Sequence, residues 1–267
     1  MKIKSAIGFS TGCMILMMVC GSAVAQDNNA DGNDNVLSQV TSRPSWLNDW
    51  TGGVDVGIDG SSGNTDTVNL HIGLNAKHTT DTMETSGSLL FLYAQQSADE
   101  TQNRFEAKLR NDWLFGADSP WRFFVEGTYE IDEFQDWDSR LSGYAGVGYE
   151  FIDNDKTFLL GMIGGGASKA FGAPNGEDDV RPELMLGLDF SHKLTERQKL
   201  TAGTQLYPNL DDTGEYRWNT QAAWEILVDP EVNLNLKLGV ENRYDSLASG
   251  DTKKNDFYYF ATLGWTF

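Results

Sequence analysis

Cysteine is scarce in this chain and lies only near its start. The 267 residues include two cysteines, Cys13 and Cys20. No disulfide framework, cysteine nucleophile or cysteine-based metal site is therefore expected after residue 20. Long apolar runs are missing as well. No run of about 18 apolar residues follows residue 25, so no transmembrane helix is expected there.

Basic residues are also few. Lysine and arginine total 20 against 39 aspartates and glutamates, which gives a formal net charge of −19. This acidity argues against nucleic acid as a partner. Acidity alone would suit a disordered chain, but an aromatic content of 12% with eight tryptophans argues against disorder for most of the sequence.

The first 25 residues have the features of a secretory signal peptide. Lys2 and Lys4 precede an apolar stretch that ends in an Ala-Val-Ala site at residues 23–25. We expect cleavage after that site, with an uncleaved anchor helix as the alternative. Residues 26–45 are polar and rich in Asn and Asp, and we expect them to form a flexible acidic periplasmic leader.

Apolar and polar residues alternate through residues 46–267. Val68, Leu70, Ile72 and Leu74, for example, alternate with polar residues or glycine, a period of two that is typical of a β-strand. Twelve such segments are candidate strands: residues 50–59, 67–78, 82–95, 103–115, 121–130, 139–151, 157–167, 181–192, 198–207, 216–228, 231–244 and 257–267.

The connections between these segments differ in length. Longer connections tend to follow odd-numbered segments, such as SADETQ at residues 97–102, and shorter ones follow even-numbered segments. An even strand count with this alternation is typical of outer-membrane barrels. We therefore predict an all-β, transmembrane antiparallel up-and-down β-barrel of twelve strands. A soluble β-sandwich or barrel is the alternative, but it would rarely place tryptophan and leucine on one outward register in so many strands.

The last segment, DFYYFATLGWTF, has one wholly apolar face, which we expect to contact lipid. Aromatic residues on that face suit the girdles of a membrane interface. An alternating aromatic strand that ends in Phe also resembles the C-terminal signal read by the barrel assembly machinery of the outer membrane. We therefore expect that machinery, membrane lipid and lipopolysaccharide as partners, and the bacterial outer membrane as the location. The expected assembly signal comprises Tyr259, Leu263, Trp265 and Phe267.

Two blocks of the sequence resemble a known family. The first, at residues 50–74, contains the Ser-Gly-Asn-Thr loop of residues 62–65, and the second spans residues 129–152 with an Asp-x-Arg element and a Gly-aromatic strand. In this order they resemble the YdiY-like family of salt-induced outer-membrane proteins, which is also catalogued as a domain of unknown function. The resemblance covers about residues 46–267. It implies the fold and the location rather than a mechanism, because that family has no agreed activity.

The inward register of the predicted barrel carries balanced charge. Its basic residues are Lys77, Arg104, Lys108, Arg110, Arg122, Arg140, Arg181, Lys199, Arg217, Lys237 and Arg243. Its acidic residues are Glu84, Glu106, Asp112, Glu126, Glu130, Glu150, Glu183, Asp189, Glu225 and Glu241. A balanced lumen can brace itself with ion pairs and would show no strong charge preference. A filled, closed lumen and a narrow passive pore both remain open.

No catalytic site is expected. An outer-membrane phospholipase would need a histidine beside a serine at the lipid-facing rim. His71 points inward, while His78 and His192 fall on the lipid register near the short-turn end, and Ser191 points away from His192. No carboxylate pair or metal-ligand spacing stands out, so neither an enzyme nor a cofactor is predicted.

The long loops hold most of the excess acidity. Hard divalent cations need several oxygen ligands close together, and the densest candidate group is Asp132, Glu133, Asp136 and Asp138. A solvated acidic surface is the alternative to cation binding. The predicted function is a non-catalytic outer-membrane barrel of structural or envelope- and salt-stress type. The alternative function is a small passive diffusion channel with a charge-balanced lumen.

Overall fold

The structure is a computed structural model. It describes residues 49–61, 67–116, 119–173, 179–212, 214–248 and 252–267. The predicted signal peptide and leader lie outside these residues. Within the described residues, no helix is long and apolar enough to cross a membrane.

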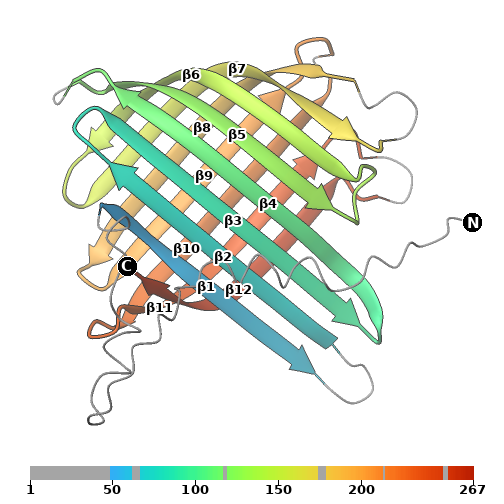
Figure 1. The fold of residues 1–267 in the computed structure, drawn as a ribbon, viewed down its shortest axis with the longest axis horizontal. Coiled ribbons are helices and arrows are strands. Elements are labelled where there is room, and N and C mark those ends of the chain that lie inside the picture. The colour runs from blue at the N-terminus through green and yellow to red at the C-terminus, as the bar shows by residue number, and fades with distance from the viewer. Residues whose placement is uncertain (1–48, 62–66, 117–118, 174–178, 213, 249–251) are drawn as a thin grey trace, which may run out of the picture. The chain divides into compact units, whose positions relative to one another are not determined.

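Twelve antiparallel β-strands close into one barrel (Figure 1). Each strand pairs with its neighbours in the chain, and β1 pairs with β12. The predicted fold class and strand number are therefore confirmed. The strands are β1 (Trp50–Ser61), β2 (Thr67–Thr79), β3 (Met83–Gln96), β4 (Asp99–Leu114), β5 (Trp121–Asp132), β6 (Ser139–Asp153), β7 (Thr157–Phe171), β8 (Arg181–Thr195), β9 (Gln198–Pro208), β10 (Tyr216–Asp229), β11 (Leu234–Asp245) and β12 (Asn255–Thr266).

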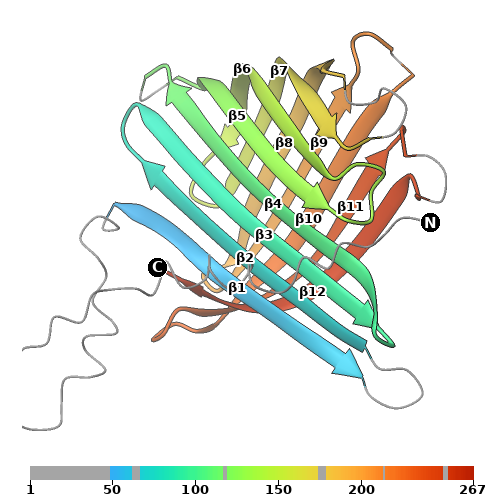
Figure 2. The ribbon, with the colours of Figure 1, turned by 45° about the vertical axis from the view of Figure 1, so that its right-hand side comes forward.

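The barrel is closed by the pairing of its first and last strands (Figure 2). The register runs from Gly53 opposite Thr266 to Val56 opposite Leu263. Beyond β12, Phe267 exchanges two backbone hydrogen bonds with Gly52, of 2.8 and 3.0 Å. Closure pairs the backbone groups of these segments of β1 and β12, which would otherwise be open to pairing with another chain.

The outer wall of the barrel is apolar. Ile58 is 75% exposed and Tyr259 is 77% exposed, and many Leu, Val and Phe side chains share their outward register. The strands are 11 to 16 residues long, whereas a membrane-crossing strand needs about 9–11 residues. Exposed aromatic side chains lie near both ends of the strands, among them Trp121, Phe151 and Trp265 at one end and Phe171, Trp218 and Phe257 at the other.

One connection differs from its prediction. Residues 97–102 were expected to form a long loop, but β3 and β4 continue to a turn of two residues, Ser97 and Ala98. Both have positive φ, 50° and 70°, as a type I′ hairpin turn requires. This turn usually contains Asn or Gly, and neither residue is present here to signal it. The end of the barrel that carries this turn and the other connections after odd-numbered strands is called the loop end below. The opposite end is called the turn end.

Apolar side chains fill one side of the lumen. They come from β5 to β9 and form a buried cluster of Phe124, Tyr144, Leu160, Met162, Met185 and Tyr207. Gly146 and Gly164 face each other across β6 and β7, and a Cβ on either would meet the backbone of the other strand. This cluster fills the lumen beside the central strands β6 and β7.

Candidate functional site

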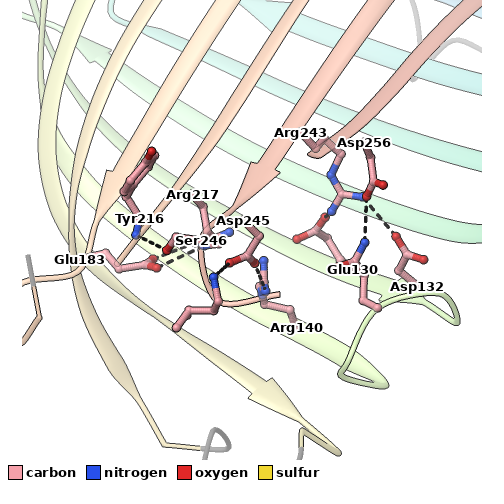
Figure 3. Close-up of polar contacts among 12 residues, drawn as sticks. Glu130, Asp132, Arg140, Glu183, Tyr216, Arg217, Arg243, Asp245, Ser246 and Asp256 are labelled. Carbon is pink, nitrogen blue, oxygen red and sulfur yellow. Dashed lines mark hydrogen bonds and ion pairs between the residues drawn. The ribbon is translucent and has the colours of Figure 1, made fainter. Parts of the chain in front are cut away.

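Charged side chains of β11 reach across the lumen at the loop end (Figure 3). These side chains occupy every second position of β11, and their charges alternate in sign. They pair with residues of β4, β5 and β6, which are not neighbours of β11 in the barrel. The pairs are Glu241 with Arg104 at 2.8 Å, Arg243 with Glu130 at 2.7 Å and with Asp132 at 3.1 Å, and Asp245 with Arg140 at 2.8 Å. We call these seven residues the ion-pair belt. The belt ties two opposite walls of the barrel together.

A second buried group supports the belt from β6, β8 and β10. Arg217 donates to both carboxylate oxygens of Glu183, at 2.8 and 3.2 Å, and to the hydroxyl of Tyr144 at 2.8 Å. Tyr144 in turn donates to Glu183. The Arg217 guanidinium also lies over the ring of Tyr207 at 4.8 Å. The two cavities found beside Arg140 and Asp245 at this end are small, about 20 and 10 Å³.

The four acidic residues predicted as a cation-binding rim do not come together. Asp132 is the last residue of β5, is 5% exposed, and pairs inward with Arg243. Asp136 accepts a hydrogen bond of 2.6 Å from Thr252, while Glu133 and Asp138 are exposed. In the part of the chain that the structure describes, no three His, Cys, Asp or Glu side chains are arranged to hold a metal ion.

Between the ion-pair belt and the turn end, the lumen contains two cavities. A cavity of about 520 Å³ extends beside β1–β5 and β8–β12. A second cavity of about 340 Å³ lies at the turn end, next to Trp265 and Phe267. The two share Asp55, Lys77 and Lys237 on their walls. The two cavities therefore adjoin at these shared residues, and the larger one reaches the belt at Arg104 and Glu241.

Ion pairs neutralise the charges around this cavity. Lys108 lies 2.9 Å from Glu126, and Arg110 donates to Asp112 through two hydrogen bonds of 2.6 and 2.7 Å. Five basic residues line the cavity, Lys77, Arg104, Lys108, Arg110 and Lys237. Five acidic residues line it as well, Asp55, Glu106, Glu126, Asp189 and Glu241. The lining therefore has no net charge when His71 is neutral.

A polar cluster marks the junction of the two cavities. The Asp55 carboxylate lies 3.4 Å from Nε2 of His71 and 3.6 Å from Nζ of Lys237. Nδ1 of His71 lies 3.2 Å from the hydroxyl of Tyr258. Asp55 faces a glycine on each neighbouring strand, and a Cβ at Gly73 would contact its carboxylate. Sequence reasoning missed Asp55, although its place on the inward register of a glycine-rich strand was visible.

The remaining predicted lumen residues take several roles. Arg122 pairs with Glu150 and lies 3.7 Å from Asp112. Glu225 and Lys237 line the turn-end cavity. The expected assembly-signal residues Tyr259, Leu263, Trp265 and Phe267 are all exposed on the outer wall.

The other two histidines have structural partners. His78 packs against Trp50, with ring centroids 5.3 Å apart, and Nδ1 of His192 lies 2.8 Å from Oγ1 of Thr157. Neither of these contacts places a serine beside a histidine.

The apolar outer wall, the strand lengths and the charged lumen define a transmembrane β-barrel. The chain belongs to the family described as "Protein of unknown function, DUF481", whose model matches residues 54–267. No curated protein sequence matches the chain.

Several solved barrels resemble the structure at low identity. A KdgM porin in complex with disordered oligogalacturonate is 8% identical, with 81% of this chain and 98% of that chain covered and a TM-score of 0.44. A NanC porin is 10% identical, with the same coverage and a TM-score of 0.45. The translocator domain of the autotransporter NalP from Neisseria meningitidis is 11% identical, with 87% and 91% covered and a TM-score of 0.44. At these values the similarities say nothing of the solutes or partners of this chain.

Proposed function

We propose that the chain is a non-catalytic barrel of the bacterial outer membrane, of structural type, with a lumen closed to through-flow. In this proposal the signal peptide is removed, the turn end faces the periplasm and the loop end faces the lipopolysaccharide. The observation that supports closure is the ion-pair belt, together with the small size of the cavities around it.

The belt is costly to open because its charges are buried. Arg104, Glu130 and Arg140 are each at most 6% exposed. Removing one partner of a buried ion pair costs roughly 3–5 kcal/mol, because the other charge is left uncompensated. Separating the pairs by thermal motion has a similar cost, and each 1.4 kcal/mol is about tenfold in population. For one pair, the open state is then populated at roughly one part in a hundred to one part in several thousand.

Single-channel recording in planar bilayers tests this proposal. Wild-type protein should give no stepwise current, while the triple variant Glu241→Gln, Arg243→Gln, Asp245→Asn should conduct, because β11 no longer binds the opposite wall. A matched control is Lys199→Gln with Glu225→Gln, which removes two facing charges at the turn end. Regular current steps from wild-type protein would overturn closure.

A passive diffusion channel is the second candidate function. The two adjoining cavities, of about 520 and 340 Å³, favour it because they already provide part of a pathway. Such a channel would show little preference for anions over cations, because the lining carries no net charge. The reversal potential under a potassium chloride gradient would therefore lie near zero.

We further propose a role in salt or envelope stress, which the resemblance of residues 50–74 and 129–152 to the YdiY-like family supports. The protein level in cells grown at low and high sodium chloride tests this role. An unchanged level across the series would count against it.

A further inference from the structure

A small niche in the wall of the large cavity has two polar side chains that form no hydrogen bond or ion pair with any residue the structure describes. Asp189 on β8 and Gln221 on β10 are the two cross-strand neighbours of Gly203 on β9. A Cβ at Gly203 would lie 3.2 Å from Oδ1 of Asp189 and 3.5 Å from Nε2 of Gln221. Both side chains therefore stand over the glycine. Because Gly203 has no side chain, space remains above it for one group of a ligand.

Asp189 differs from every other carboxylate that lines the cavity. Asp55 pairs with His71 and Lys237, Glu106 and Glu241 pair with Arg104, and Glu126 pairs with Lys108. Among the described residues, Asp189 has no cation within 4.0 Å and no hydrogen bond. The Asp189 carboxylate is half-buried and faces the cavity, so its oxygens are available to accept hydrogen bonds from a ligand that enters it.

The surroundings of the niche indicate the class of ligand. The formal charges of the lining cancel, so the lining as a whole favours neither sign of net charge on a ligand. The open groups are hydrogen-bonding ones: the Asp189 carboxylate, the amides of Gln221 and Asn219, and the hydroxyls of Ser86 and Ser88 on the opposite side. Phe260 adds an apolar face. A volume of about 520 Å³ lies within the range of small-molecule sites.

We propose that the lumen cavity binds a small neutral solute rich in hydroxyl groups, of the size of a mono- or disaccharide. The solute enters from the turn end, and two of its hydroxyls bind at the niche of Asp189, Gly203 and Gln221. A carboxylate is a strong acceptor for hydroxyl donors, and the amide of Gln221 supplies both a donor and an acceptor. This site lies below the belt, so it requires neither an open nor a closed loop end.

Isothermal titration calorimetry on the full processed protein tests the site. The detergent must be zwitterionic, because a sugar head group would compete for the cavity. Glucose, maltose and sorbitol serve as neutral probes, and glucuronate and glucosamine as charged ones. We expect at least one neutral probe to bind with about millimolar or better affinity, and both charged probes to bind more weakly than the best neutral one.

Three variants locate the binding. Gly203→Val fills the niche, and Asp189→Asn keeps the shape but removes the charged acceptor. Each should weaken binding at least about tenfold, which corresponds to the loss of one hydrogen bond to a charged group. Gly165→Val is the matched control, because Gly165 has open space on the outer wall, and it should bind as wild type does. Heat-dependent gel mobility verifies that each variant is folded.

Three results would overturn the inference. The first is that no neutral probe binds the wild-type protein. The second is binding that Gly203→Val and Asp189→Asn leave unchanged, which would place the ligand elsewhere. The third is tighter binding of glucuronate or glucosamine than of every neutral probe, which would refute the neutral class. The bilayer recordings are independent of all three, so failure of this site and failure of closure are distinguishable.

Discussion

Replacing Arg217 by methionine should destabilise the barrel more than replacing the whole ion pair. The guanidinium and the Glu183 carboxylate are buried, with side-chain exposures of 8% and 5%. Among the described residues, Arg217 is the only cation within 4.0 Å of Glu183. Methionine keeps much of the volume of arginine but leaves this carboxylate uncompensated beside the Tyr144 hydroxyl.

The expected magnitudes differ clearly. Arg217→Met alone should lower the free energy of unfolding by about 3–5 kcal/mol, the usual cost of breaking a buried pair from one side. The double variant Arg217→Met, Glu183→Gln should recover most of that loss, because a buried pair replaced by neutral groups of similar volume is often nearly neutral. The carboxamide at position 183 can still accept the Tyr144 hydrogen bond.

Reversible urea unfolding in lipid vesicles, followed by tryptophan fluorescence, measures both values. The comparison is made at low and high sodium chloride, because salt screens buried pairs far less than exposed ones. If the double variant is as unstable as the single one, the loss comes from packing and not from an unpaired charge. That result would refute the electrostatic account of the Arg217–Glu183 pair.

Three further predictions concern closure and access. Gly73→Val should displace the Asp55 carboxylate and lower the free energy of unfolding by about 1–3 kcal/mol. Gly87→Val should lower it less, because a Cβ at Gly87 would meet nothing closer than 3.7 Å. Equal urea midpoints for the two variants would contradict this prediction. Phe267→Asp should reduce assembly in the outer membrane while export continues, and normal levels in the membrane fraction would refute the assembly role. Ser88→Cys, unique in the processed chain because both native cysteines lie within the first 20 residues, should react with an impermeant maleimide from the periplasmic side only; labelling of intact cells from outside would contradict closure.

Strand positions were largely predictable because a barrel strand exposes one face to lipid and one to the lumen. The alternation in residues 67–78 predicted β2 to within one residue, and the observed strand is Thr67–Thr79. Errors occurred where turn chemistry was unusual, as at Ser97 and Ala98, or where a strand ran further than its pattern. Asp132 was assigned to a loop because β5 was predicted to end at residue 130.

The contacts across the lumen could not be predicted in the same way. Parity placed Arg104 and Glu241 on the inward register, but their pairing across 137 residues depends on which walls approach each other. That approach is set by the apolar cluster on one side of the lumen and by the stagger of the strands. The niche at Gly203 was missed for a similar reason, since its two polar neighbours belong to different strands.

The alternating charges of β11 have a consequence for how the barrel reaches its correct register. Apolar alternation alone tolerates a slip of two residues, because every side chain then keeps its face. Such a slip would bring Arg243 opposite Arg104 and Asp245 opposite Glu130, so like charges would meet in the lumen. We therefore expect the belt to disfavour shifted strand registers late in assembly, because they place like charges together. A disulfide between Ala222→Cys and Val240→Cys, which are register partners, would report the correct pairing. Its yield should fall when Arg243 is replaced by glutamate, and an unchanged yield would show that the strands find their register without the belt.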